Sequence, residues 1–374
     1  MSIRQSNPGG IVKPGFNPLA AQTSTTFYSL YGWGRNLEGE IGNSTTVDKY
    51  SPIQVDSGQT WIDIVCGTYH KIARKTDGTM WSWGLNTSGQ LGFGGGDRSS
   101  PVQIGALTTW SKIAAGGRAG YAIKTNGTLW AWGNNTYGQL GNGTSGYYTK
   151  ESSPIQIGAL TTWLNISAGG YNCWAIKTDG TLWCWGTNGG GQLGQGNTTQ
   201  RSSPVQVGSL TNWSKTFGQW AIKTDGTLWA WGYNSNGILG NGSTTDISSP
   251  VQIGALTNWS KLDSGSATLA IKTDGTLWSW GSNAQGQLGL GNRTNYSSPK
   301  QVGSYTTWAE VSASKSSHAI KTDGTLWGWG DNGDGTIGTD NFTHYSSPIQ
   351  IGSQTDWFKI AEQQGSGAIV GALG

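Results

Sequence analysis

The chain has 374 residues, of which only 11% are charged, and its net charge of +3 is spread thinly. Because there is no run of Lys or Arg, a surface that tracks nucleic-acid phosphates is not expected. No stretch approaches the roughly 20 apolar residues of a membrane span, and three cysteines are too few for a disulfide framework. The 62 glycines and 22 tryptophans exceed ordinary usage, and most of them belong to an internal repeat.

The first 26 residues are rich in Pro and Gly and lack hydrophobic periodicity. They predict an extended arm, residues 1–26, and not part of a folded domain. Arg4 is not followed by an apolar segment, so the sequence does not predict secretion. We expect the arm to dock on a protein partner through its apolar side chains, Ile11, Val12, Phe16 and Leu19.

From residue 27 onward the chain repeats a pattern about every 49 residues. A Trp-Gly pair leads into a Gly-x-Leu/Ile-Gly turn, a polar loop ends at Ser-Pro before a short strand, and a second tryptophan starts another strand. Four short strands per repeat predict an all-β fold, a seven-bladed β-propeller over residues 27–374. The two tryptophan series are Trp33, Trp83, Trp132, Trp185, Trp231, Trp280 and Trp329, and Trp61, Trp110, Trp163, Trp213, Trp259, Trp308 and Trp357.

Each repeat contains a segment like residues 270–281, AIKTDGTLWSWG, which predicts a β-hairpin. We expect its Asp-Gly pair to form a two-residue turn. That turn would place Ile271 opposite Trp278 and Ala270 opposite Ser279, which gives the hairpin one bulky and one small face. Such sheets would stack with the tryptophan face of one on the small face of the next.

The ends of the chain resemble the two strands of this hairpin. Residues 367–370 match the first strand and residues 30–34 match the second. We therefore expect the N-terminal strand to complete the last blade and close the ring.

The succession of Trp-Gly, Gly-Gln-Leu-Gly, Ser-Pro, Ala-x-Gly, Asp-Gly and Trp-x-Trp-Gly resembles the repeat of the regulator of chromosome condensation (RCC1) family over residues 27–374. The resemblance implies the propeller fold, and the family includes an exchange factor for a small GTPase, ubiquitin-ligase modules and a plant ultraviolet receptor. The wedge-like loop of the exchange factor and the Gly-Trp-Arg-His-Thr motif of the receptor are absent, and only residues 66–70 keep the family's Gly-x-x-His. The near-identical blades, the low charge and the arm are similar to RCC1-repeat proteins of tailed bacteriophages, which implies a virion role.

Few residues stand out from the repeat as candidates for chemistry. We interpret the Lys-Thr-Asp/Asn-Gly-Thr turns as turn-capping, not as a ligand face. Residues 331–335 only superficially resemble a calcium loop, because the ligand spacing fails. The histidines, His70, His318 and His344, occupy unrelated repeat positions, so neither a zinc site nor a catalytic base is expected. The sequence therefore predicts a non-enzyme with no cofactor and no metal.

Two cysteines and two tryptophans of the repeats are expected at buried positions. Cys173 and Cys184 would be diagonal neighbours on one hairpin face, which leaves both a bridge and two buried free thiols open. Trp174 and Trp220 take the position of Leu269 opposite a Trp-Gly tryptophan, and we interpret them as core residues.

Two loops vary between repeats, and binding is expected there because loops carry function on a uniform scaffold. One precedes Ser-Pro and is longest at Tyr147-Tyr148, the first choice for a contact site. The other follows Ala-x-Gly; it is full length at Arg118 and shortened at residues 215–220. The alternative that these are ordinary surface residues stays open. The candidate contacts are Tyr50, Arg98, Arg118, Tyr147, Tyr148, Arg201, Tyr296 and Tyr345.

These observations favour a non-enzymatic interaction protein of the virion. Its arm would dock on a capsid or tail partner, and the loops of a monomeric propeller would be displayed to a host surface glycan or protein. The alternative is a cellular, cytoplasmic RCC1-like regulator or scaffold that binds a small GTPase or another protein. This alternative includes chromatin among its partners, which the sparse charge disfavours, so we expect neither nucleic-acid binding nor membrane insertion.

Overall fold

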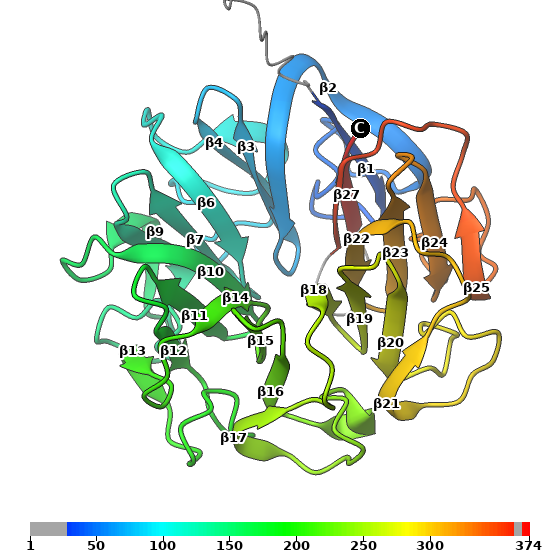
Figure 1. The fold of residues 1–374 in the computed structure, drawn as a ribbon. Helices are drawn as coiled ribbons and strands as arrows, with labels where there is room; N and C mark the ends of the chain where they lie inside the picture. Colours follow the sequence, from blue (N-terminus) through cyan, green and yellow to red (C-terminus); the bar gives the residue numbers. More distant parts are fainter. Residues whose placement is uncertain (1–27, 363–368) are drawn as a thin grey trace, which may run out of the picture.

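The computed structural model describes residues 28–362 and 369–374, so the predicted arm contacts Ile11, Val12, Phe16 and Leu19 lie outside the described residues. Within these ranges the chain is all β apart from one 3-10 turn, η1 (Ser235–Gly237), and it contains no helix that could cross a membrane. Its strands form five four-stranded sheets and one seven-stranded sheet, arranged around a central axis (Figure 1). The all-β propeller architecture predicted from the sequence is confirmed.

Each four-stranded sheet is an antiparallel meander in chain order. The sheets comprise β6 (Trp110–Ala115), β7 (Ala119–Lys124), β8 (Leu129–Asn134) and β9 (Lys150–Gln156); β10 (Trp163–Gly169), β11 (Asn172–Lys177), β12 (Leu182–Gly186) and β13 (Arg201–Gln206); β14 (Trp213–Thr216), β15 (Trp220–Lys223), β16 (Leu228–Gly232) and β17 (Ile247–Gln252); β18 (Trp259–Ser264), β19 (Ala267–Lys272), β20 (Leu277–Gly281) and β21 (Tyr296–Gln301); and β22 (Trp308–Ala313), β23 (Ser316–Lys321), β24 (Leu326–Gly330) and β25 (Tyr345–Gln350).

The two ends of the chain meet in the seven-stranded sheet. Its order is β26 (Lys359–Glu362), β27 (Ile369–Leu373), β1 (Tyr28–Gly34), β2 (Lys49–Cys66), β3 (His70–Lys75), β4 (Met80–Gly84) and β5 (Arg98–Gln103). The long strand β2 pairs first with β1, at Leu30 and Asp56, and then with β3, at Asp63 and Arg74. One strand therefore serves as the last strand of one meander and the first strand of the next.

The predicted pairing of the terminal strands is confirmed, but the matched residues differ. In β27, Ala372 and Leu373 hold the places of the repeat's Ala-Ile, because Leu30 pairs with Leu373 and Tyr31 with Ala372. The sequence comparison had assigned those places to residues 368 and 369, four positions earlier in the chain.

The hairpin register is shifted by one residue from the prediction. Gly275 N donates to Lys272 O (3.0 Å) and Lys272 N donates to Thr276 O (3.1 Å), so the connection is a type I turn followed by a glycine at φ +75°. A Cβ on that glycine would lie 2.1 Å from Thr306 O. Ala270 consequently pairs with Trp278 and Ile271 with Leu277, so the predicted pairing of Ile271 with Trp278 is wrong.

This register changes how neighbouring sheets pack. Trp280 and Ala270 share one face, which packs on Ile222 and Leu228 of the preceding sheet. Leu269 and its neighbours form the opposite face and pack on the next sheet. Each face thus mixes large and small residues, and the predicted division into a bulky and a small face is wrong.

Tryptophan N–H groups tie each meander to the one before it. The indole of Trp280 is fully buried and donates to Ile238 O (2.8 Å). Gly240 lies against this ring, because a Cβ there would be 2.7 Å from the indole nitrogen. The equivalent bonds are Trp83 to Glu40 O, Trp132 to Gln90 O, Trp185 to Gln139 O, Trp231 to Gln192 O, Trp329 to Gln287 O and Trp33 to Thr336 O. The last of these links the two ends of the ring.

Candidate functional site

The central axis holds a cavity of about 680 Å³. We call the strands that line it the inner strands: the C-terminal part of β2, then β6, β10, β14, β18, β22 and β26. At the end of the ring where each inner strand turns into the next strand, the connecting loops cluster. We call this end the loop face.

The wall of the cavity is short at β14, because the strands that form it there have few residues. This strand and β15 have four residues each, whereas β18 and β19 have six. Phe217 N donates to Trp220 O (2.9 Å), and Gly218 adopts φ +72°, so the chain turns back at once. The shortened loop predicted at residues 215–220 is confirmed, and it opens the cavity sideways towards the loop face.

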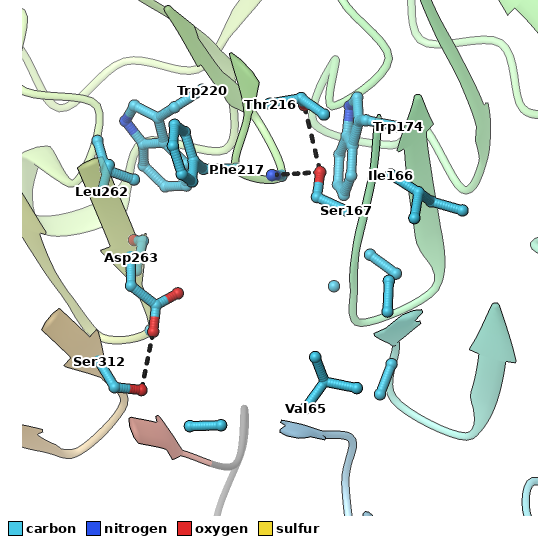
Figure 2. A pocket seen from close by; sticks show the side chains of 18 of the residues that line it. Val65, Ile166, Ser167, Trp174, Thr216, Phe217, Trp220, Leu262, Asp263 and Ser312 are labelled. Atoms are coloured by element: carbon cyan, nitrogen blue, oxygen red, sulfur yellow. Dashed lines mark hydrogen bonds between the residues drawn. The ribbon is translucent and has the colours of Figure 1, made fainter. Parts of the chain in front are cut away.

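Four large aromatic side chains and Gln219 line this gap, which we call the recess; the aromatic residues are Trp174, Phe217, Trp220 and Tyr233. Figure 2 shows Phe217 beside Trp220, with Trp174 on the other side of the Thr216 strand end. Trp174 and Trp220 pair with Cys184 and Ala230, so a large residue stands opposite a small one in both hairpins. Their exposed fractions are only 4% and 5%, which fits the core interpretation, yet both line the cavity.

The polar groups of the cavity are engaged with one another. Ser167 Oγ lies 3.2 Å from Thr216 Oγ1 and accepts from Gly218 N (3.0 Å). On the facing wall Asp263 accepts from Ser312 Oγ (3.0 Å), as Figure 2 shows, and from Ala313 N (2.9 Å). These hydrogen bonds hold the polar side chains of the two walls in place.

A second cavity of about 560 Å³ adjoins the first at the loop face, and the two share Ser264 and Gly265. Its lining includes Arg118, Tyr171 and Lys315 and no acidic residue. Tyr171 is 42% exposed and packs on Tyr137 of the preceding repeat, with ring centroids 4.9 Å apart.

Buried asparagines hold the longer loops of the loop face, and the sequence reasoning missed them. Asn283 Oδ1 accepts from Leu288 N (2.9 Å), while its Nδ2 donates to Asn292 O and Thr294 O (both 3.0 Å). Because a side-chain amide can both accept and donate hydrogen bonds, one asparagine closes the turn and fixes the loop before Ser-Pro. The signal was an Asn three residues after each Trp of the Trp-Gly pair, at Asn36, Asn86, Asn135, Asn188, Asn234, Asn283 and Asn332.

The buried titratable groups are not poised for reaction. Burial lowers the pKa of His70 to about 4 and raises the pKa of Cys184 to about 12. Cys173 pairs with Trp185 and Cys184 with Trp174, so the two thiols point to opposite faces and are free. Their predicted place on one face is wrong, because the hairpin register is shifted. No three His, Cys, Asp or Glu residues of the described ranges are placed to hold a metal ion.

The turn lysines stack on tryptophans instead of forming a ligand face. Lys272 Nζ lies 3.6 Å from the centroid of Trp278 and 5.0 Å from that of Trp259. Desolvation lowers the pKa of this lysine. Asp274 Oδ1 accepts from Thr276 N (3.0 Å) and Oγ1 (2.6 Å), and these bonds lower the pKa of the carboxyl group. The turn-capping interpretation is confirmed.

We expect Lys272→Met to lower the free energy of unfolding by about 1 kcal/mol, because it keeps the apolar stem and removes the cation from the two rings. Chemical denaturation of the purified chain measures this loss. Lys112→Met is the control, since Lys112 is exposed, and it should change stability by less than about 0.5 kcal/mol. Equal losses in both variants would contradict a cation–π contribution.

Comparison with known proteins places this geometry in a family. The regulator of chromosome condensation (RCC1) repeat matches residues 29–73, 77–123, 126–176, 179–217, 225–269 and 274–318. The chain belongs to the RCC1-repeat family. The resemblance drawn from the sequence motifs is thereby confirmed at the level of the repeat.

Curated relatives share only segments with this RCC1-repeat chain. E3 ubiquitin-protein ligase HERC2 of Mus musculus is 26% identical over 175 residues, which cover 45% of this chain and 4% of that protein. The X-linked retinitis pigmentosa GTPase regulator homolog of Caenorhabditis elegans is 35% identical over 66 residues, which cover 17% and 5%. The chain therefore spans a small part of the length of these relatives.

Solved structures share the fold over most of the chain. Human WBSCR16 superimposes with a TM-score of 0.81 at 18% identity and covers 92% of this chain and 98% of its own. Prp20p from Saccharomyces cerevisiae, whose structure was described with its binding to Gsp1p and histones, gives 0.82 at 18% identity, with coverages of 93% and 92%. These likenesses establish the RCC1-type propeller fold.

Most of the sequence-predicted contact residues are spread around the rim of the RCC1-repeat ring. Each lies at or beside the first residue of the last strand of its meander, close to the Gly of a Trp-Gly pair. These residues therefore belong to five separate meanders: Tyr50, Arg98, Arg201, Tyr296 and Tyr345. The structure brings only Tyr147 and Tyr148 together, at 83% and 89% exposure with centroids 5.5 Å apart. Arg118 stands apart from all of them in the second cavity.

Proposed function

We propose that this protein is a non-enzymatic scaffold that binds another protein through its loop face. One observation carries the proposal: the repeats differ chiefly at that face. There the β14–β15 connection is short, Tyr147 and Tyr148 project from the longest loop, and Tyr233 is 54% exposed. The opposite face repeats nearly identical Asp-Gly turns. Exposed tyrosines suit protein contact, because they offer large amphipathic area at low entropic cost.

The comparisons support a protein partner more than the virion role. The RCC1-type structure of yeast Prp20p was described with binding to Gsp1p and histones, and yeast RCC1 was solved with Kap60. The virion reading rests on residues 1–26, outside the described ranges, and on likeness to phage proteins. We therefore favour the alternative of a cellular, cytoplasmic scaffold, and a host glycan or capsid partner is not part of the proposal.

We also infer a ring of seven blades. The seven-stranded sheet would act as two blades that share β2, since this strand pairs with β1 in its first part and with β3 in its second. This count agrees with the seven inner strands around the cavity. A monomeric ring of this kind would leave the whole loop face available to the partner.

Site-specific photo-crosslinking in the cells that make the protein tests the scaffold proposal. p-Benzoylphenylalanine replaces Tyr148 on the loop face or, as control, Leu256 on the opposite face, which is 45% exposed. We expect position 148 to give one adduct of defined mass with a protein that mass spectrometry can identify, and position 256 to give none. No adduct at 148, or the same adducts at both positions, would refute binding through the loop face.

A further inference from the structure

Neighbouring loops of the loop face are joined by a chain of main-chain hydrogen bonds. Thr68 N donates to Gly117 O (2.9 Å), and Gly117 N donates to Gly170 O (2.7 Å). Beyond the β14–β15 connection, neighbouring loops are again joined by a main-chain hydrogen bond, in which Ser266 N donates to Ser314 O (3.1 Å). Each bond runs from a main-chain N–H of one loop to a carbonyl oxygen of the following loop. The chain therefore has a consistent direction around the ring.

This chain is interrupted at the short β14–β15 connection. The loop that should follow Gly170 is too short to reach, and Gly218 N instead donates to the Ser167 side chain inside the wall. Gly170 is exposed, and its N–H makes no main-chain hydrogen bond within the described residues. The loop at Gly170 therefore has no bond to a carbonyl oxygen of the following loop, whereas Gly117 and Ser266 each donate to one.

The surroundings of the gap combine aromatic surface with positive charge. Tyr171 borders it on one side, and Phe217 and Tyr233 border it on the other through the recess. Arg118 lines the same cavity as Gly170 and is exposed, and within the described residues it makes no ion pair with a carboxylate. The nearest acidic side chain on the cavity wall, Asp263, already accepts from Ser312 and Ala313.

We propose that this gap is the docking site for an extended, acidic peptide segment of the partner, an inference that rests on the proposed scaffold function. A main-chain carbonyl of the segment accepts from Gly170 N–H and takes the place of the missing loop. An Asp or Glu side chain of the segment pairs with the Arg118 guanidinium, which favours carboxylates by its planar donors. An apolar side chain of the segment enters the recess beside Phe217.

A loop-completed variant provides the sharpest test. In it, residues 217–219 are replaced by the longer sequence of residues 263–268, which comprises the end of β18, the connecting loop and the start of β19. The exchange should restore the chain of hydrogen bonds and occupy the gap without adding an arginine. Circular dichroism and thermal unfolding must first match those of the parent chain.

The probe is a display library of random twelve-residue peptides, selected on the full parent chain and counter-selected on the loop-completed variant. We expect enriched peptides to carry Asp or Glu next to an apolar residue. A synthetic peptide of the enriched sequence should bind the parent at least about a hundredfold more tightly than the loop-completed variant. Arg118→Ala should weaken binding about tenfold, whereas Arg293→Ala, an exposed arginine elsewhere on the rim, should not.

Hydrogen exchange gives a second readout that a general loss of folding would not imitate. Bound peptide should slow exchange of the Gly170 amide and leave the amides of the opposite face unchanged. An empty selection, peptides without acidic residues, or equal binding to both chains would overturn the docking site. Crosslinking from position 148 is independent of the gap, so the scaffold function could survive that failure.

Discussion

Trp280→Ala is expected to lower the free energy of unfolding by about 3–5 kcal/mol, the range for loss of a fully buried tryptophan. The indole is completely buried between two sheets, and its removal leaves a cavity against Ile222 and Leu228. It also removes one of the two hydrogen bonds that Ile238 O accepts, because only the bond from Thr268 Oγ1 (2.9 Å) remains.

Denaturant unfolding of the purified chain measures this loss, with two matched variants beside it. Trp280→Phe keeps most of the packing and removes the donor, so its loss should be clearly smaller. Trp278→Ala removes a partly exposed tryptophan of the same strand, and it should cost less than Trp280→Ala. If all three variants lost the same amount, the indole bond between sheets would not be a principal contact.

Glu40→Gln is expected to destabilise the fold by about 3 kcal/mol, because it removes the carboxylate whose negative charge raises the pKa of the buried Lys71. Glu40 is fully buried, 3.8 Å from Arg35, and burial raises the pKa of its carboxyl group. Lys71 is fully buried as well, and desolvation lowers its pKa to about 8. Other repeats place a neutral pair here: Ser317 Oγ donates to Gln287 O (2.8 Å).

The double variant Glu40→Gln/Lys71→Ser recreates that neutral pair and should recover most of the loss. The cost of Glu40→Gln should also shrink as the pH rises through 8, because Lys71 then becomes neutral in the folded parent and gains little from the carboxylate. Thermal or urea unfolding at pH 7 and pH 9.5 checks both statements. A cost that is independent of pH and is not recovered in the double variant would contradict a buried ion pair.

The repeat could be read from the sequence because its signals are local. Tryptophans, Ser-Pro and Asp-Gly recur at fixed spacing, and together they define four strands and their order. The hairpin register could not be fixed in this way, because an Asp-Gly pair suits both a two-residue turn and a type I turn with a following glycine. Of the two residues Asp274 and Gly275, only Gly275 has a positive φ. Each cross-strand pair of the hairpin is consequently shifted by one residue from the prediction.

The candidate site depends on relations between repeats that the sequence does not display. The short loop at residues 215–220 was visible, but its consequence depends on the neighbouring loops around Gly170 and Ser266. Trp174 and Trp220 were placed in the core, and they are buried, yet they also line the recess. Tyr147 and Tyr148 were recognised as exposed because they interrupt a uniform pattern.

The shared strand β2 makes the ring mechanically uneven. Five sheets are joined to their neighbours by links without strand pairing, whereas β2 runs unbroken for 18 residues between two meanders. A load applied at one of those meanders is carried into the other by a continuous hydrogen-bonded ladder. The arc around β14 and β15, with its four-residue strands, has no such shared strand to either neighbour.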